Sequence, residues 1–86
     1  MKRGRNAVLR LIRVWSGQYQ HDVAAALHTD QSTVSRIEHG GIPVSEELER
    51  RFVLACGGVS VVQTLIDHLE SLIERLNRNN NRLLPA

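Results

Sequence analysis

The residues from 31 to 36 carry hydrogen-bonding side chains at five of six positions and include neither an acid nor a lysine. The amide of Gln31 can donate and accept at once, so it can pair with N6 and N7 of adenine. The guanidinium of Arg36 can pair with O6 and N7 of guanine or hold a phosphate. The other polar side chains are small and allow a close approach: Ser32, Thr33 and Ser35. These residue types are suited to reading the edges of DNA bases.

Other residues with chemical potential form no recognisable motif. The four histidines are 7, 11 and 29 residues apart, which matches no compact metal-ligand spacing: His21, His28, His39 and His68. The single cysteine, Cys56, can form neither an internal disulfide framework nor a thiolate cage. No glycine-rich phosphate loop is present. We therefore expect no metal, no cofactor and no enzymatic activity.

A chain of 86 residues, 42% of them hydrophobic, has room for one domain and one core. No apolar run approaches the length of a membrane-spanning helix, and no secretory signal follows the basic residues at 2–5. Residues 1–41 carry six Lys or Arg against three Asp or Glu, whereas residues 42–86 carry five against six. We expect a cytoplasmic, nucleoid-associated protein whose first half faces a polyanion.

Helical periodicity is the only regular pattern, and no alternation typical of strands is visible. The first periodic segment has apolar residues at i, i + 3, i + 4 and i + 7: Val8, Leu11, Ile12 and Trp15. This spacing predicts one buried face of a helix. Gly17 follows and offers the left-handed residue that commonly ends a helix.

Residues 20–27 and 31–39 are predicted to form two short helices joined by a tight turn, which is a helix-turn-helix. Asp30 is a good N-cap for the second of them, and Ser45 caps a fourth helix that ends at Gly57-Gly58. We expect the following residues to face inward: Val23, Ala24, Leu27, Val34, Ile37, Leu48, Phe52 and Ala55. The sequence therefore predicts an all-α fold, a compact five-helix bundle with a long, amphipathic C-terminal helix.

The last predicted helix, roughly residues 60–78, has apolar residues spaced 3, 4, 3 and 4: Val62, Leu65, Leu69, Leu72 and Leu76. Two heptads are short for an independent coiled coil, so the seam packs on its own core or against a second copy. We expect it to form a homodimer interface, because helix-turn-helix proteins often bind palindromic sites as dimers. The neighbouring edge, with Val61, Ile66 and Ile73, is expected to face its own core.

These patterns divide the chain into four parts. We expect a flexible basic arm at 1–5, a helix-turn-helix domain at 6–58, a dimerisation helix at 59–78 and a disordered tail at 79–86. The arm either follows the minor groove of DNA or acts only as a solvated tail.

The chain resembles the XRE, or phage Cro/repressor-like, family of helix-turn-helix proteins. The resemblance rests on these stretches: Leu9–Arg13, Gly17, Gln20–Ala24, Leu27 and Gln31–Gly40. It implies a sequence-specific transcriptional regulator that binds double-stranded DNA as a homodimer through a recognition helix at 31–39. Within that class we expect a repressor.

The resemblance also implies roles for individual residues. Gln20 would bond a backbone phosphate, aided by the helix N-terminus, and Arg36 would read a base or hold a phosphate. The remaining residues expected at the DNA are Gln31, Ser32, Thr33, Ser35 and His39. Arg13 and Glu38 match a structural ion pair between the first and third helices, so they belong to the scaffold.

Three positions depart from the family pattern. His28 stands in the turn where the family usually has glycine, and histidine is among the residues that tolerate a left-handed conformation. Tyr19 replaces the usual Ser or Thr cap before the second helix. Asp30 caps the third helix but places a carboxylate near the expected phosphates, which lowers affinity for DNA.

A protein-interaction module is the alternative function. The last helix would then bind a partner protein, as in an antitoxin-like subunit or an adaptor, and DNA binding would be secondary. The partners expected from the sequence are therefore double-stranded DNA, a second copy of the chain and, in the alternative, a protein at the C-terminal helix. No membrane partner is expected, because the polar face of that helix mixes acids with arginines.

Overall fold

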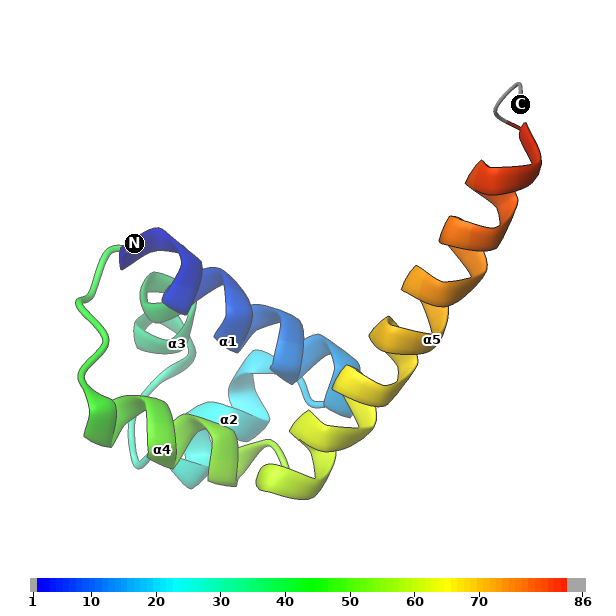
Figure 1. Cartoon of the computed structure of the whole chain (residues 1–86). Helices are drawn as coiled ribbons and strands as arrows, with labels where there is room; N and C mark the ends of the chain where they lie inside the picture. The colour runs from blue at the N-terminus through cyan, green and yellow to red at the C-terminus, as the bar shows by residue number, and fades with distance from the viewer. Residues whose placement is uncertain (1, 84–86) are drawn as a thin grey trace.

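The computed structural model describes residues 2–83, and every regular element in that range is a helix. The helices are α1 (Lys2–Ser16), α2 (Gln20–Ala26), α3 (Gln31–Glu38), α4 (Glu46–Ala55) and α5 (Val59–Leu83). The prediction of an all-α fold is therefore confirmed. Helices α1 to α4 pack around one core, and α5 extends away from them (Figure 1).

The caps of α3 and α4 are those that the sequence predicts. The Asp30 side chain accepts a hydrogen bond from the Thr33 N–H, at 2.8 Å, and the Ser45 hydroxyl accepts one from the Leu48 N–H, at 3.1 Å. Each bond satisfies a backbone donor that the first turn of a helix leaves without a partner. The two caps therefore fix where α3 and α4 begin.

The core lies where α1 to α4 meet the base of α5. Its largest fully buried side chains include Phe52 of α4, Leu9 of α1 and Val34 of α3. The buried set also contains these residues: Ile12, Val23, Ala24, Leu27, Ile37, Cys56 and Leu65. The inward faces predicted for α2 and α3 are thus confirmed, and Leu48 and Ala55 of α4 pack against the same core while partly exposed.

Helix α1 turns a different face inward from the one that its spacing predicts. Three of the four residues expected to be buried are exposed: Val8 at 51%, Leu11 at 46% and Trp15 at 39%. Only Ile12 of that set is buried, together with Leu9. The prediction was wrong because α1 has apolar residues on both sides, so periodicity alone does not decide which side faces the core.

Polar residues decide which side of α1 is buried. Asn6 is 6% exposed, and its amide donates to the carbonyl oxygens of Ile37 and Ile42, just before and after the end of α3. These bonds satisfy carbonyl groups at the end of a helix that would otherwise need water. Asn6 therefore anchors α1 to the C-terminal end of α3.

An ion pair joins α1 to α3 beside this anchor. The Arg13 guanidinium contacts both carboxylate oxygens of Glu38, and it also donates to the carbonyl oxygen of Gln18 at 2.9 Å. The Glu38 side chain is fully buried and the Arg13 side chain is 12% exposed. The hydrogen bond to Glu38 raises the pKa of Arg13 above its ordinary value. A buried carboxylate is tolerated here because a forked cation neutralises it.

Both ends of the chain differ from the expected arm and tail. Helix α1 begins at Lys2, so residues 2–5 are helical, and the Arg5 guanidinium lies 3.4 Å from the Glu49 carboxylate of α4. Helix α5 continues to Leu83 instead of ending near Arg78. A regular hydrogen-bonded helix needs no periodic apolar face at its ends, which is why the pattern underestimates its length. Met1 and residues 84–86 lie outside the described residues.

Most of α5 packs on no other element of residues 2–83. Leu65 is buried, but Ile66 and Ile73, which were expected to face the core, are 43% and 57% exposed. The helix leaves the core after its first turns, so only its base can contribute to that core. The protein measures 55 × 24 × 20 Å, and its radius of gyration is 16.0 Å. A compact chain of this length would have a radius of gyration of about 12 Å.

Within residues 2–83, no single helix is both long and apolar enough to cross a membrane. Helices α4 and α5 pass that test of length and composition only as a pair, bent by 84° at the break between them.

Replacing Arg13 with methionine should destabilise the protein by about 3 kcal/mol, because it leaves the buried Glu38 carboxylate without its cation. The double variant Arg13→Met/Glu38→Gln should recover part of that loss, since no buried charge remains. Urea denaturation followed by circular dichroism gives both free energies of unfolding. Equal losses in the single and double variants would contradict the assignment of the cost to an unpaired charge.

The Cys56 thiol should react slowly with a thiol reagent in the native protein and quickly after denaturation. Cys56 is 2% exposed, and burial raises its pKa, so the reactive thiolate is scarce at neutral pH. The measurement is the rate of reaction with Ellman's reagent at pH 8, with and without denaturant. A native rate close to that of a free thiol would show that the core opens readily.

Candidate nucleic-acid interface

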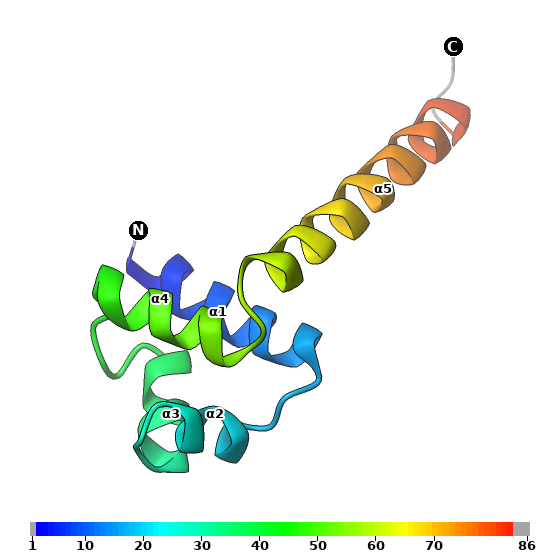
Figure 2. The same ribbon diagram turned by 90° about the horizontal axis from the view of Figure 1, so that it is seen from below.

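A tight turn places α2 and α3 side by side at one end of the core (Figure 2). The turn passes through His28, whose φ of 57° is left-handed, and the Thr29 N–H returns to the carbonyl oxygen of Ala24 at 2.9 Å. The left-handed histidine expected in place of the family's glycine is therefore present. Asp30 then starts α3 in a new direction. This geometry exposes the outer side of α3 while Val34 and Ile37 remain in the core.

The first turns of α2 and α3 border an open recess of about 350 Å³. Four of the residues expected at DNA line it: Gln20, Gln31, Ser32 and Ser35. All four side chains end in groups that can both donate and accept hydrogen bonds. The recess is polar, and a flat edge of hydrogen-bonding groups, such as that of a base pair, has complementary chemistry.

The orientation of Gln31 is set from inside the protein. The Gln20 side chain donates from Nε2 to the Glu38 carboxylate at 3.0 Å, because a carboxylate only accepts. Its Oε1 must therefore face outward, and it accepts from Gln31 Nε2 at 3.4 Å. Gln31 consequently turns its own carbonyl oxygen away from Gln20. A chain of polar contacts thus runs from Arg13 through the buried Glu38 and Gln20 to the exposed Gln31.

The expected contact residues occupy different positions along α3. Ser32 and Arg36 are exposed, one turn apart, on the outer side of the helix. Thr33 lies at the N-terminal turn, where its backbone N–H is held by Asp30. The His39 ring lies at the end of the helix and donates from Nδ1 to the carbonyl oxygen of Ser35 at 2.8 Å. The roles of these residues at DNA stay predictions.

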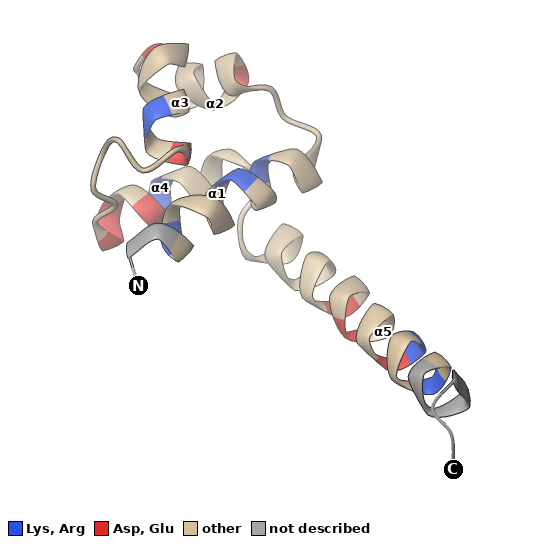
Figure 3. Ribbon diagram, turned by 90° about the horizontal axis from the view of Figure 1, so that it is seen from above, with Lys and Arg blue, Asp and Glu red and all other residues tan. Residues whose placement is uncertain are grey.

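Few charges lie around the recess. Arg36 is the cation of α3 that faces solvent, whereas Arg13 is neutralised by Glu38. Figure 3 shows that the other acidic and basic residues of the described chain lie mostly on α1, α4 and α5, while α2 carries Asp22 in its first turn. Hydrogen bonds from Thr33 lower the pKa of Asp30, and Arg36 lowers it further, so this cap carries a full negative charge at neutral pH. The electrostatic attraction of this face for a polyanion is therefore modest.

Sequence reasoning assigned Gln20 to a phosphate and did not foresee that its amide bridges Glu38 and Gln31. It also missed Asn6, whose bonds hold the end of α3 in place. No clear signal for Asn6 exists in the sequence, because an asparagine in a helix that also carries several arginines can equally face solvent. No signal for the Gln20 bridge exists in the sequence, because it depends on how closely α2 and α3 approach.

Comparison with known proteins identifies the family of the chain. A family model described as a helix-turn-helix domain matches residues 7–69, which is 63 of the 86 residues. No curated protein and no solved structure matches the chain. The matched region contains α2, the left-handed turn, α3 and the ion pair that supports them. The chain therefore belongs to the helix-turn-helix domain family of the XRE-like type.

Proposed function

We propose that the protein is a sequence-specific regulator of transcription that binds double-stranded DNA by inserting α3 into the major groove. The observation that carries this proposal is the recess lined by Gln20, Gln31, Ser32 and Ser35, at the exposed start of α3. Residues near the start of a recognition helix contact base edges in helix-turn-helix proteins. Gln31 presents its amide there in an orientation held by Gln20, which lowers the entropy lost on binding.

A homodimer is the second part of the proposal. A second copy would double the contacts with DNA, and two recognition helices one turn of DNA apart, about 34 Å, would read a palindrome. The exposed seam residues of α5 support association, because Leu69, Leu72 and Leu76 are each at least 40% exposed. Repression is the simplest mode of action, since the chain needs only to occupy its site. The protein would act in the cytoplasm, at the nucleoid.

A protein adaptor is the competing proposal, and the same exposed seam favours it. In that case α5 would bind a different protein, and α3 would contribute little. The two proposals predict different behaviour of the purified protein. A regulator that acts alone should select a DNA sequence without any added protein, whereas an adaptor should not.

Selection from a pool of random DNA duplexes at about 150 mM salt tests the DNA function, because nonspecific binding to phosphates is weak at this concentration. We expect a two-fold palindrome. The variant Gln31→Ala should bind that site more weakly by about 1–3 kcal/mol and lose its preference at one base pair of each half-site. Arg36→Ala should act in the same way if Arg36 reads a base, and should weaken binding to all sequences equally if it holds a phosphate.

Gln63→Ala is the matched control, since Gln63 is exposed on α5 and its amide bonds only Asp67 among the described residues. It should leave the selected sequence unchanged. Failure of the unmodified protein to enrich any sequence would reject the DNA function and favour the adaptor.

Replacing Asp30 with asparagine should raise affinity for the selected site severalfold and leave stability unchanged. Asparagine caps a helix about as well as aspartate, so α3 should begin at the same residue. The variant removes the negative charge of a carboxyl group whose lowered pKa keeps it ionised at neutral pH. Fluorescence anisotropy at several salt concentrations measures the affinity, and thermal denaturation checks the cap. A lower affinity at equal stability would show that the Asp30 carboxylate itself takes part in recognition.

A further inference from the structure

The side of α1 that faces away from the core is apolar and, apart from a contact between the rings of Trp15 and His68, is left uncovered by residues 2–83. Its large residues Val8, Leu11 and Trp15 are 39–51% exposed, and Gly4 continues the same side with open space around it. We call these four residues the α1 outer face. A helix that is apolar on both sides is normally buried on both sides. Because the core covers only one side, the other requires a further partner.

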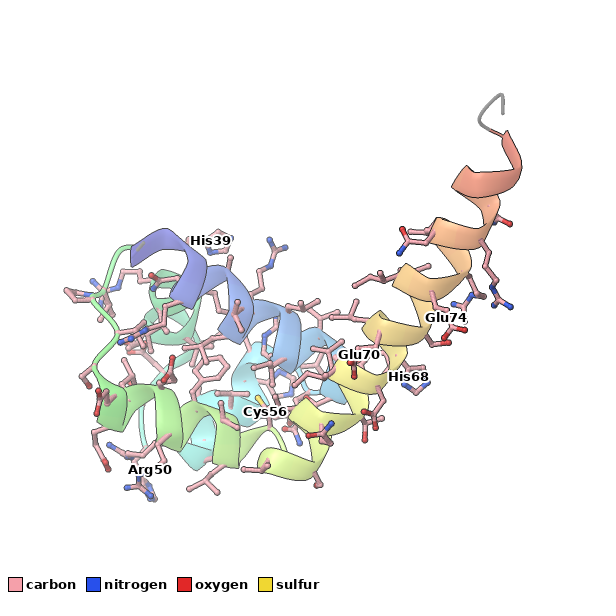
Figure 4. All side chains as sticks on the ribbon, in the orientation of Figure 1. His39, Arg50, Cys56, His68, Glu70 and Glu74 are labelled. Atoms are coloured by element: carbon pink, nitrogen blue, oxygen red, sulfur yellow. The ribbon has the colours of Figure 1, made fainter. Side chains whose placement is uncertain are left out.

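A second apolar surface lies on α5, beyond the point where that helix leaves the core. It consists of five residues that are 40–57% exposed: Ile66, Leu69, Leu72, Ile73 and Leu76. We call these residues the α5 stripe. The opposite side of the helix carries charges of both signs, and Glu74 projects from it away from α1 (Figure 4). The α5 stripe is therefore the apolar side of an amphipathic helix.

The two surfaces cannot cover each other within one chain. Helices α1 and α5 touch where the rings of Trp15 and His68 lie 5.0 Å apart, and from that contact they diverge (Figure 1). Helix α5 is continuous from Val59 to Leu83, so it cannot fold back along α1. The α5 stripe consequently points past the end of its own α1, and no other element of residues 2–83 covers it.

We propose that two copies of the chain exchange their α5 helices, so that the α5 stripe of each copy packs on the α1 outer face of the other. This inference rests on the homodimer of the proposed function and adds α1 to its interface. The lengths match, since Gly4–Trp15 and Ile66–Leu76 span about 17 Å and about 15 Å of helix axis. In a dimer with a two-fold axis, the two symmetric contacts cover both surfaces of both copies at once.

The exposed area favours a second copy over a contact through one helix alone. Complete covering of the α1 outer face and the α5 stripe would bury on the order of 650 Å² per copy, or about 1,300 Å² in a dimer, which lies at the lower end of the range of stable interfaces. The three large residues of the α1 outer face supply roughly a third of that area, too little for a specific interface alone. The exchange also leaves α3 accessible, because α2 and α3 lie on the side of the core away from the end of α5 (Figure 2).

The mass in solution gives the first test. Sedimentation equilibrium of the full chain should return twice the 9.7 kDa of one copy. Leu72→Glu in the α5 stripe and Leu11→Glu in the α1 outer face should each shift the protein to the monomer mass. The matched controls Ser71→Glu and Arg10→Glu change exposed neighbours and should remain dimeric. Circular dichroism checks that every variant is folded. A monomeric unmodified protein, or a dimeric Leu11→Glu variant, would overturn the proposal.

Cross-linking between copies gives the second test and does not depend on a destabilising charge. Two separate proteins, Leu11→Cys and Leu72→Cys, are mixed and treated with a short bis-maleimide. Leu11 and Leu72 lie near the middle of their surfaces, so they meet whichever way the helices run. We expect a product that contains one copy of each variant, identified by mass spectrometry. Absence of this mixed cross-linked product would overturn the proposed packing of α5 on the α1 of the other copy.

The buried Cys56 should give no product in the unmodified protein, which serves as the control. Neither test uses DNA, so their outcomes are independent of the selection experiment. A cross-linked dimer that selects no sequence would retain this inference and reject the DNA-binding part of the proposed function. A monomer that selects a single half-site would reject this inference together with the homodimer and retain DNA binding through α3.

Discussion

The buried ion pair between Arg13 and Glu38 is the interaction on which the rest of the structure depends. It fixes α3 against α1, and it also decides which side of α1 enters the core, since Arg13 must face Glu38. Once that side is chosen, Leu9 and Ile12 become core residues and the α1 outer face is left to solvent. An isolated buried carboxylate would be too costly, so the choice is nearly forced.

The same ion pair reaches the surface through hydrogen bonds. Glu38 accepts a hydrogen bond from Gln20, and Gln20 in turn accepts one from Gln31. The orientation of each amide is therefore determined by its hydrogen-bond partner on the inner side. The exposed amide of Gln31 is thereby partly ordered before any ligand arrives. Hydrogen bonds held in advance cost less entropy when a partner binds, which is how a scaffold residue contributes to recognition without touching the partner.

The fold separates two surfaces with different chemistry. The polar recess at the start of α3 is small, weakly charged and rich in groups that donate and accept. The α1 outer face and the α5 stripe are apolar, and α5 carries its stripe away from the recess. A small domain buries a limited fraction of its own surface, so association with a partner is a common source of additional stability. Recognition and association can therefore proceed on different sides of one short chain.

The sequence by itself determined the helical class, the caps at Asp30 and Ser45, the left-handed turn at His28 and the family, because each depends on neighbours in the chain. It also indicated the Arg13 and Glu38 pair through the family resemblance. Only the tertiary structure decided which side of α1 is buried and how Gln20 holds Gln31. Periodicity identifies an apolar side, but a helix that is apolar on two sides leaves the choice to long-range polar contacts.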